Sequence, residues 1–141
     1  MKLIFLFRRK PATTFEQFRE YYERHHAPLA ASLLPYFKSY KRNYIRHGED
    51  YRPSGIGVKA DFDVVTEIGF ASRSDYERMR QALADPTILT RIVQDEENFM
   101  DRSPQGRMMF LVDEEETDEQ LLKFLASQAV GPPAREEASQ T

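Results

Sequence analysis

The chain has 141 residues, of which 40% are apolar and 30% charged, and its net charge is −3. These values are typical of one globular domain with a hydrophobic core, and the intermixed charges do not favour nucleic-acid binding. The sequence has no cysteine, which excludes disulfides, zinc thiolates and a cysteine nucleophile. Its apolar N-terminal run, residues 3–7, is too short for a signal peptide, and no run approaches the ~20 residues of a membrane span. We therefore expect a cytoplasmic protein that contacts neither nucleic acid nor membrane.

The first half of the chain has the pattern of strand, helix and strand. Residues 2–9 form an apolar run of strand length. A threonine capping box follows it, and then four side chains recur at helical spacing: Phe15, Phe18, Tyr22 and His26. Pro28 is expected to end or kink this helix. Residues 36–47 form a second strand, and the glycine-containing residues 48–62 form a long loop of the kind that often serves as a lid or binding loop.

The second half repeats this order. Residues 63–71 alternate as a third strand, Ser74 caps a helix, Asp85-Pro86 begins another, and residues 107–114 form a fourth strand. This order predicts an α+β fold of the ferredoxin-like, split βαβ type. Its core would be a four-stranded antiparallel sheet with helices on one face.

Residues 116–141 are expected to be an extension of a ferredoxin-like domain that spans residues 1–115. Thr117 can cap a short apolar helix in this extension. The polar residues 132–141 are expected to be disordered.

The first and fourth strands are apolar on both of their faces. Leu3, Phe5 and Phe7 alternate with Ile4 and Leu6 in the first strand. Two helices can cover only one face of a sheet, so the other face would expose an apolar patch that monomers rarely tolerate. Packing against a second copy of the chain would bury that patch, which predicts a homodimer.

The sharpest chemical signal is His26 at the end of the first helix. Its helical spacing from Phe18 and Tyr22 directs the ring toward the sheet. The helix C-terminus favours the protonated ring while burial opposes it, so His26 can serve as a general acid or base. Tyr22, one turn earlier, can orient the imidazole. The same spacing also fits a structural histidine bonded to a carbonyl and a tyrosine that only fills the core.

Glu67 is the charged residue in the middle of the third strand. It either forms an ion pair with Arg42 or Arg46 on the neighbouring strand, or faces an apolar cavity as a second titrating group. Asp63 lies on the same face near the start of that strand, where it could contact a ligand or water.

Tyr40, Tyr44 and Arg46 share one face of the second strand and could bind an aromatic ligand, or could form a half-solvated outer face. His25 and His26 are adjacent, so they point in different directions on a helix. No metal site and no cofactor site is predicted.

Three segments resemble a known family. The opening, KLIFLFRRKPATTFEQFREYYERHHAPLA, contains the most specific motif, His26-Ala27-Pro28-Leu29. The other two are Asp63-x-x-x-Glu67-Ile68-x-Phe70 and Asp95-Glu96-x-x-Phe99-x-Asp101. Together they resemble the EthD-like family of the dimeric α/β-barrel superfamily.

The resemblance implies a ferredoxin-like subunit whose dimer forms a barrel, with a pocket between each sheet and its helices or loops. Relatives include cofactor-free dehydratases, cyclases and isomerases of aromatic or polyketide-like compounds, and cofactor-free oxygenases occur in neighbouring families. By resemblance, His26 is the catalytic group. Gly69 stands where a large aromatic residue is common, which predicts a roomier pocket.

The leading hypothesis is a small cofactor-independent enzyme of the isomerase, cyclase or dehydratase type. It would transfer a proton on a hydrophobic, aromatic metabolite, with His26 as acid or base, Tyr22 orienting it and Glu67 as the second titrating group. The alternatives are a binding or carrier protein for such a metabolite, a cofactor-free oxygenase, and a structural oligomerisation module.

Overall fold

The computed structural model describes residues 1–113 and 115–128 and contains the expected four-stranded antiparallel sheet. Its strands are β1 (Lys2–Phe7), β2 (Ser39–Tyr44), β3 (Val64–Gly69) and β4 (Arg107–Val112). They lie in the order β2-β3-β1-β4, and each neighbouring pair is antiparallel. The predicted α+β, ferredoxin-like fold is therefore confirmed.

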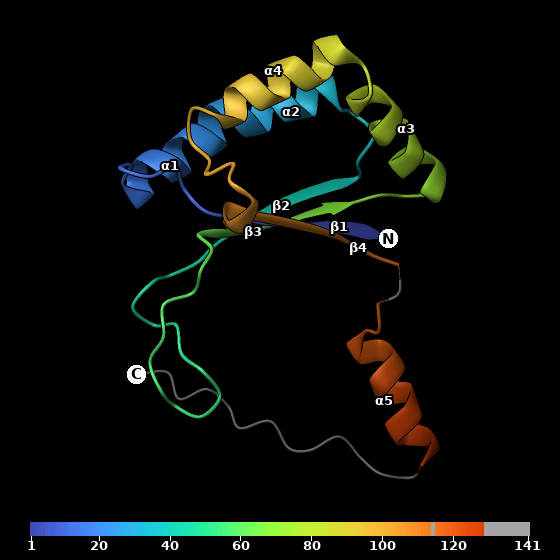
Figure 1. Ribbon diagram of the computed structural model, residues 1–141. Coiled ribbons are helices and arrows are strands. Elements are labelled where there is room, and N and C mark those ends of the chain that lie inside the picture. Colours follow the sequence, from blue (N-terminus) through green and yellow to red (C-terminus); the bar gives the residue numbers. More distant parts are fainter. Residues whose placement is uncertain (114, 129–141) are drawn as a thin grey trace.

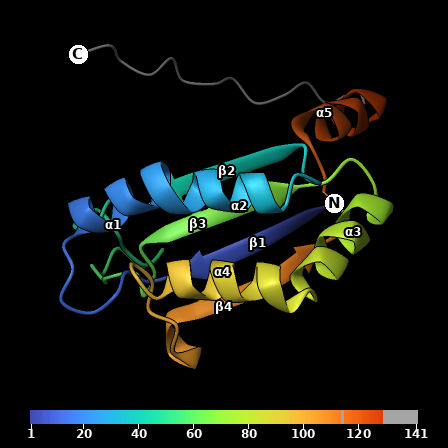
Figure 2. The ribbon, with the colours of Figure 1, turned by 90° about the horizontal axis from the view of Figure 1, so that it is seen from above.

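The helices before β4 cover one face of the sheet (Figure 1). They are α1 (Phe15–Tyr21), the π-helical turn η1 (Tyr22–His26), α2 (Ala27–Leu33), α3 (Arg73–Leu83) and α4 (Pro86–Glu96). Seen from above, α1 and α2 lie over β2 and β3, while α4 lies beside them over β1 and β4 (Figure 2). A short 3₁₀ turn, η2 (Pro104–Gly106), leads into β4.

Side-chain N-caps lie at the starts of the helices, mostly at the residues that the sequence predicts. Thr14 forms the capping box of α1 with Gln17, and Asp85 caps α4 immediately before Pro86. The cap of α3 is Ser72 rather than Ser74, because the Ser72 hydroxyl accepts the Asp75 backbone N–H. The helix therefore begins two residues earlier than predicted.

Of the two outcomes expected at Pro28, an end or a kink, the helix does not end there: η1 continues directly into α2. The Ala27 N–H donates to the carbonyl of Tyr22, five residues back, which makes η1 a π turn. This wider turn shifts the hydrogen-bond register, so that Pro28 falls in the first turn of α2, where a missing N–H costs little. Tyr22 and His26 are the buried residues of this turn.

The core consists of two clusters under the helices. An aromatic cluster gathers Phe7, Phe18, Tyr22 and Phe99, and a more aliphatic cluster gathers Leu3, Ala30, Leu34, Phe70, Met79 and Ile92. Because β1 crosses the middle of the sheet, it contributes Phe7 to the first cluster and Leu3 to the second.

The opposite face of the sheet exposes apolar side chains. Met108 and Phe110 of β4 are 52% and 44% exposed. The predicted C-terminal helix is present as α5 (Asp118–Ser127), begins after a Thr117 capping box, and lies on this side of the sheet (Figure 1). It exposes Leu121 and Phe124. The expected disordered segment, residues 132–141, lies outside the described residues.

Candidate functional site

A cavity of about 180 Å³ lies between the helices and the covered face of the sheet. Its walls are mainly apolar and include Leu3, Phe37, Ile68, Met79 and Ile92. A cavity of ~150 Å³ in another protein holds benzene, so this one accommodates a small aromatic molecule. The polar residues on its wall are Tyr22, His26, Tyr40, Thr66, Glu96, Arg102 and Arg107. An apolar pocket with a few convergent polar groups is the usual form of a small-molecule site.

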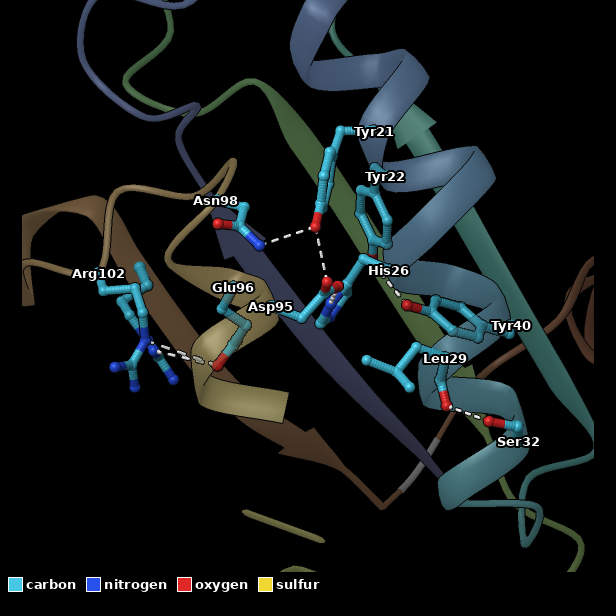
Figure 3. Close-up of polar contacts among 11 residues, drawn as sticks. Tyr21, Tyr22, His26, Leu29, Ser32, Tyr40, Asp95, Glu96, Asn98 and Arg102 are labelled. Atoms are coloured by element: carbon cyan, nitrogen blue, oxygen red, sulfur yellow. Dashed lines mark hydrogen bonds and ion pairs between the residues drawn. The ribbon is translucent and has the colours of Figure 1, made fainter. Parts of the chain in front are cut away.

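His26 projects from η1 toward α4, where Asp95 meets it. Nδ1 of the ring lies 2.8 Å from Oδ2 of Asp95, and the histidine is only 5% exposed (Figure 3). The Phe99 ring packs against the imidazole with centroids 4.9 Å apart. Nε2 makes no hydrogen bond to any of the described side chains or backbone groups, so it is the ring nitrogen left for a ligand in the cavity.

Asp95 is itself held in place by two further side chains. The Tyr21 hydroxyl donates to Oδ1 of Asp95 at 2.7 Å, and Nδ2 of Asn98 donates to the Tyr21 oxygen at 2.9 Å (Figure 3). Burial and the bond to Asp95 raise the pKa of Tyr21, so its hydroxyl remains a donor. This chain of contacts fixes the carboxylate and, through it, the orientation of the His26 ring.

Three hydroxyls form a second polar group on the cavity wall. The Tyr22 oxygen lies 2.8 Å from that of Tyr40 and 2.9 Å from Oγ1 of Thr66. Burial raises the pKa of Tyr22 to about 12 and that of Tyr40 well above its usual value, so both stay protonated. The three hydroxyls carry three protons but make only two contacts with one another, which leaves one proton to donate to a ligand oxygen.

Glu96 is a buried carboxylate on the same wall. Oε1 lies 3.6 Å from Nε of Arg102 and 3.8 Å from a terminal nitrogen of Arg107. Burial raises the pKa of Glu96, although Arg107, His26 and Arg102 oppose this shift.

Glu67 is not part of this site. It lies on the uncovered face of the sheet, where Lys2 Nζ is 3.2 Å from its Oε1 and Asn43 also donates to it. The bond from Lys2 lowers its pKa, opposite to the rise expected in an apolar cleft. The ion-pair explanation thus fits the structure, with Lys2 on β1 as the partner rather than Arg42 or Arg46.

Of the predicted ligand-binding residues, only Tyr40 lines the cavity. Tyr44 shares its face, but donates to Glu23 at 2.7 Å and packs in the aromatic core. Arg46 lies beyond the end of β2 with its side chain 81% exposed. Asp63 accepts a bond from Nε2 of His47 at 2.8 Å before the start of β3. These three side chains therefore have structural or surface positions in this fold.

Two features expected to shape the pocket lie elsewhere. Gly69 is absent from the cavity wall, and a Cβ at that position would meet the Ser39 side chain on β2. The long loop, residues 48–62, also contributes no side chain to this cavity. The pocket is formed by the helices, the sheet and the segment between α4 and β4.

Sequence reasoning did not assign Tyr21, Thr66, Arg102 or Arg107 to the site. Nor did it assign Asp95 and Glu96. They appeared only as part of a family motif. Both stand at the C-terminus of α4, where the helix dipole disfavours negative charge. The sequence does contain one signal for them. Two carboxylates at a helix end that disfavours negative charge, next to an apolar stripe, indicate that a side chain from another element binds them.

The described residues contain neither a metal site nor a membrane-spanning helix. Within residues 1–113 and 115–128, no group of three or more histidine, aspartate or glutamate side chains is arranged to hold a metal ion. Over the same residues, no helix has the length and apolar character needed to cross a membrane.

The sheet covered by helices on one face, with a histidine–carboxylate pair beside an apolar cavity, defines an α+β protein of ferredoxin-like fold with a small-molecule pocket. The family model of the EthD domain matches residues 10–103, so the chain belongs to the EthD family. The conidial pigment biosynthesis dehydratase EthD of Metarhizium robertsii is 26% identical over 102 residues, which cover 67% of this chain and 70% of that protein.

Solved structures support the same fold. An EthD-like protein from Ralstonia eutropha is 17% identical, with a TM-score of 0.55 over 83% of this chain and 95% of that one. An ethyl tert-butyl ether D (EthD) family protein from Bacillus halodurans is 20% identical, with a TM-score of 0.53 over 81% of this chain and 97% of that one.

Proposed function

We propose that the protein is a cofactor-independent enzyme that transfers a proton on a hydrophobic, aromatic metabolite held in the cavity. The observation that carries this proposal is the His26–Asp95 pair, 2.8 Å apart, with the imidazole on the wall of an apolar pocket. A base whose other ring nitrogen is bound by a carboxylate is the usual arrangement for general acid–base catalysis.

The side chains divide into two roles. Nε2 of His26 removes a proton from the carbon next to a ligand carbonyl, and Asp95 stabilises the imidazolium that results. The three linked hydroxyls, of Tyr22, Tyr40 and Thr66, donate a hydrogen bond to the carbonyl oxygen as negative charge develops there. In an isomerisation the proton then returns to a different atom of the ligand. In a dehydration it leaves together with a hydroxyl group of the ligand as water. The name of the Metarhizium relative supports the dehydratase, or lyase, outcome over isomerisation or cyclisation.

A simple ketone tests the proton transfer without knowledge of the natural substrate. We expect the protein to accelerate deuterium incorporation into the ring methylenes of 2-indanone in D₂O. The loss of their proton NMR signals measures the rate. His26→Gln should remove this acceleration, since a positioned base contributes ~10²–10⁴-fold. Glu67→Gln is the matched control, because that carboxylate lies on the opposite face of the sheet, and it should exchange at the wild-type rate.

Two results would reject this assignment. If 2-indanone binds but gains deuterium only at the buffer rate, the protein is a carrier rather than a proton-transfer enzyme. If His26→Gln keeps the full rate while folded, the base lies elsewhere.

We also propose that the protein forms a homodimer through the uncovered face of its sheet. Met108 and Phe110 are exposed there beside Ile4 and Leu6 of β1, which are only half-buried. Such a patch is typical of an interface between copies. This arrangement would leave the cavity on the helix-covered side of each subunit.

Phe110→Glu should convert the dimer to a monomer, because it places a charge in the middle of this apolar face. Light scattering coupled to size exclusion gives the mass directly. Ile56→Glu is the control, since Ile56 is 66% exposed in the long loop. A Phe110→Glu protein that keeps the dimer mass would exclude this face as the interface.

A further inference from the structure

At one end of the cavity the charged side chains on the wall are two arginines and one carboxylate. Arg102, in the segment after α4, and Arg107, the first residue of β4, both line the cavity and approach Oε1 of Glu96. Glu96 follows Asp95 in α4, so this end adjoins the His26–Asp95 pair (Figure 3). Two guanidinium groups here face one buried carboxylate, and Arg102 also lies 4.0 Å from an oxygen of the exposed Glu97.

The donors of both arginines are largely unused. Their closest approaches to Glu96, 3.6 and 3.8 Å, are longer than hydrogen bonds. Neither guanidinium donates a hydrogen bond to another side chain or backbone group in the part of the chain that the structure describes. Nε of Arg102 is buried without an acceptor. Because neither guanidinium group has a hydrogen-bond acceptor among the described residues, both can donate to a ligand that enters the cavity that they line.

We propose that the ligand of this cavity is a hydrophobic acid whose carboxylate is bound by Arg102 and Arg107. The inference rests on the proposed function and adds the substrate class. A guanidinium presents its N–H groups as a planar fork that matches a carboxylate, and such charge-assisted bonds are stronger than those to a neutral carbonyl. The apolar walls contact the rest of the molecule.

The position of Glu96 is consistent with this assignment. A second carboxylate entering beside it would be repelled if Glu96 were charged. Burial raises the pKa of Glu96, which makes protonation on ligand binding easier. The other ionisable groups near this end are His26, Asp95 and Glu97.

A pair of ligands that differ only in charge tests the inference. Indane-2-carboxylate and indane-2-carboxamide have the same ring and nearly the same shape. Isothermal titration of the full chain at pH 7 should show the acid binding at least ~10-fold more tightly than the amide, as expected for a hydrogen bond to a charged group. Arg102→Gln and Arg107→Gln should each lower the affinity for the acid by ~10-fold or more and leave that for the amide unchanged.

Two further variants sharpen the test. Arg46→Gln removes an equally charged residue whose side chain is 81% exposed, and it should bind both ligands as wild type does. Glu96→Gln removes the competing carboxylate without changing its shape, and it should bind the acid more tightly than wild type. Circular dichroism confirms that each variant is folded.

The outcomes separate this inference from the proposed function. Equal affinity for acid and amide, or acid affinity unaffected by both arginine substitutions, would mean that the arginines serve only Glu96 and would overturn the inference. Failure of the acid to bind would also overturn it. The exchange of 2-indanone and its dependence on His26 are read independently, because 2-indanone has no carboxylate.

Discussion

Asp95→Asn should slow the exchange of 2-indanone by ~100-fold or more, which approaches the effect of removing His26 itself. Asparagine keeps the size of the side chain but has no charge to stabilise the imidazolium. Its amide N–H₂ can also donate to Nδ1 of His26, which would place the imidazole proton on Nε2, the nitrogen that must act as base. The variant should therefore fold normally, bind 2-indanone and lose most of its rate.

A double substitution distinguishes positioning from an independent contribution. If Asp95 acts only through His26, Asp95→Asn combined with His26→Gln should be no slower than His26→Gln alone. Tyr21→Phe removes one hydrogen bond to the far oxygen of Asp95 and should have a smaller effect, ~10-fold or less. An Asp95→Asn protein that exchanges at the wild-type rate would show that this carboxylate has no part in the reaction.

The fold could be predicted because each element has its own local signals. The alternation in the strands and the caps at Thr14 and Asp85 are short-range patterns that the structure retains. The expectation that the helix could end at Pro28 is wrong, because the usual rule considers only an α-helical register. In the π turn before Pro28 the backbone N–H groups bond to carbonyls five residues back instead of four. The sequence of residues 22–26 has no feature that predicts this change.

The site was only half predictable. His26 and Tyr22 were found because their helical spacing places them on the apolar stripe. Asp95 comes from α4, 69 residues away, and a contact of that separation depends on how two helices pack rather than on any local pattern. For Glu67 the sequence leaves two alternatives, an ion pair or an acid facing the cavity, because β1 is apolar on both sides and gives no sign of which face the helices cover. The structure fits the ion pair, with Lys2 as the partner.

Phe99→Ala should lower the free energy of unfolding by ~3–5 kcal/mol, the range for removing a buried aromatic side chain. The ring is 1% exposed and lies between the core and the site. Its centroid is 5.2 Å from that of Tyr21, 5.4 Å from Tyr22 and 4.9 Å from His26. Urea titration followed by circular dichroism at one protein concentration measures the loss. Tyr51→Ala, at a side chain 71% exposed, should change the free energy by less than ~0.5 kcal/mol.

The position of Phe99 also predicts an effect on catalysis that core packing elsewhere does not have. Phe70→Ala removes an equally buried ring from the aliphatic cluster, outside the cavity wall, and should cost similar stability while leaving the exchange rate of the folded protein unchanged. Phe99→Leu, a milder change that keeps the chain folded, should slow exchange because it removes the ring against which the imidazole rests. Normal exchange in Phe99→Leu would mean that the bond from Asp95 alone is sufficient to hold His26 in its reactive orientation.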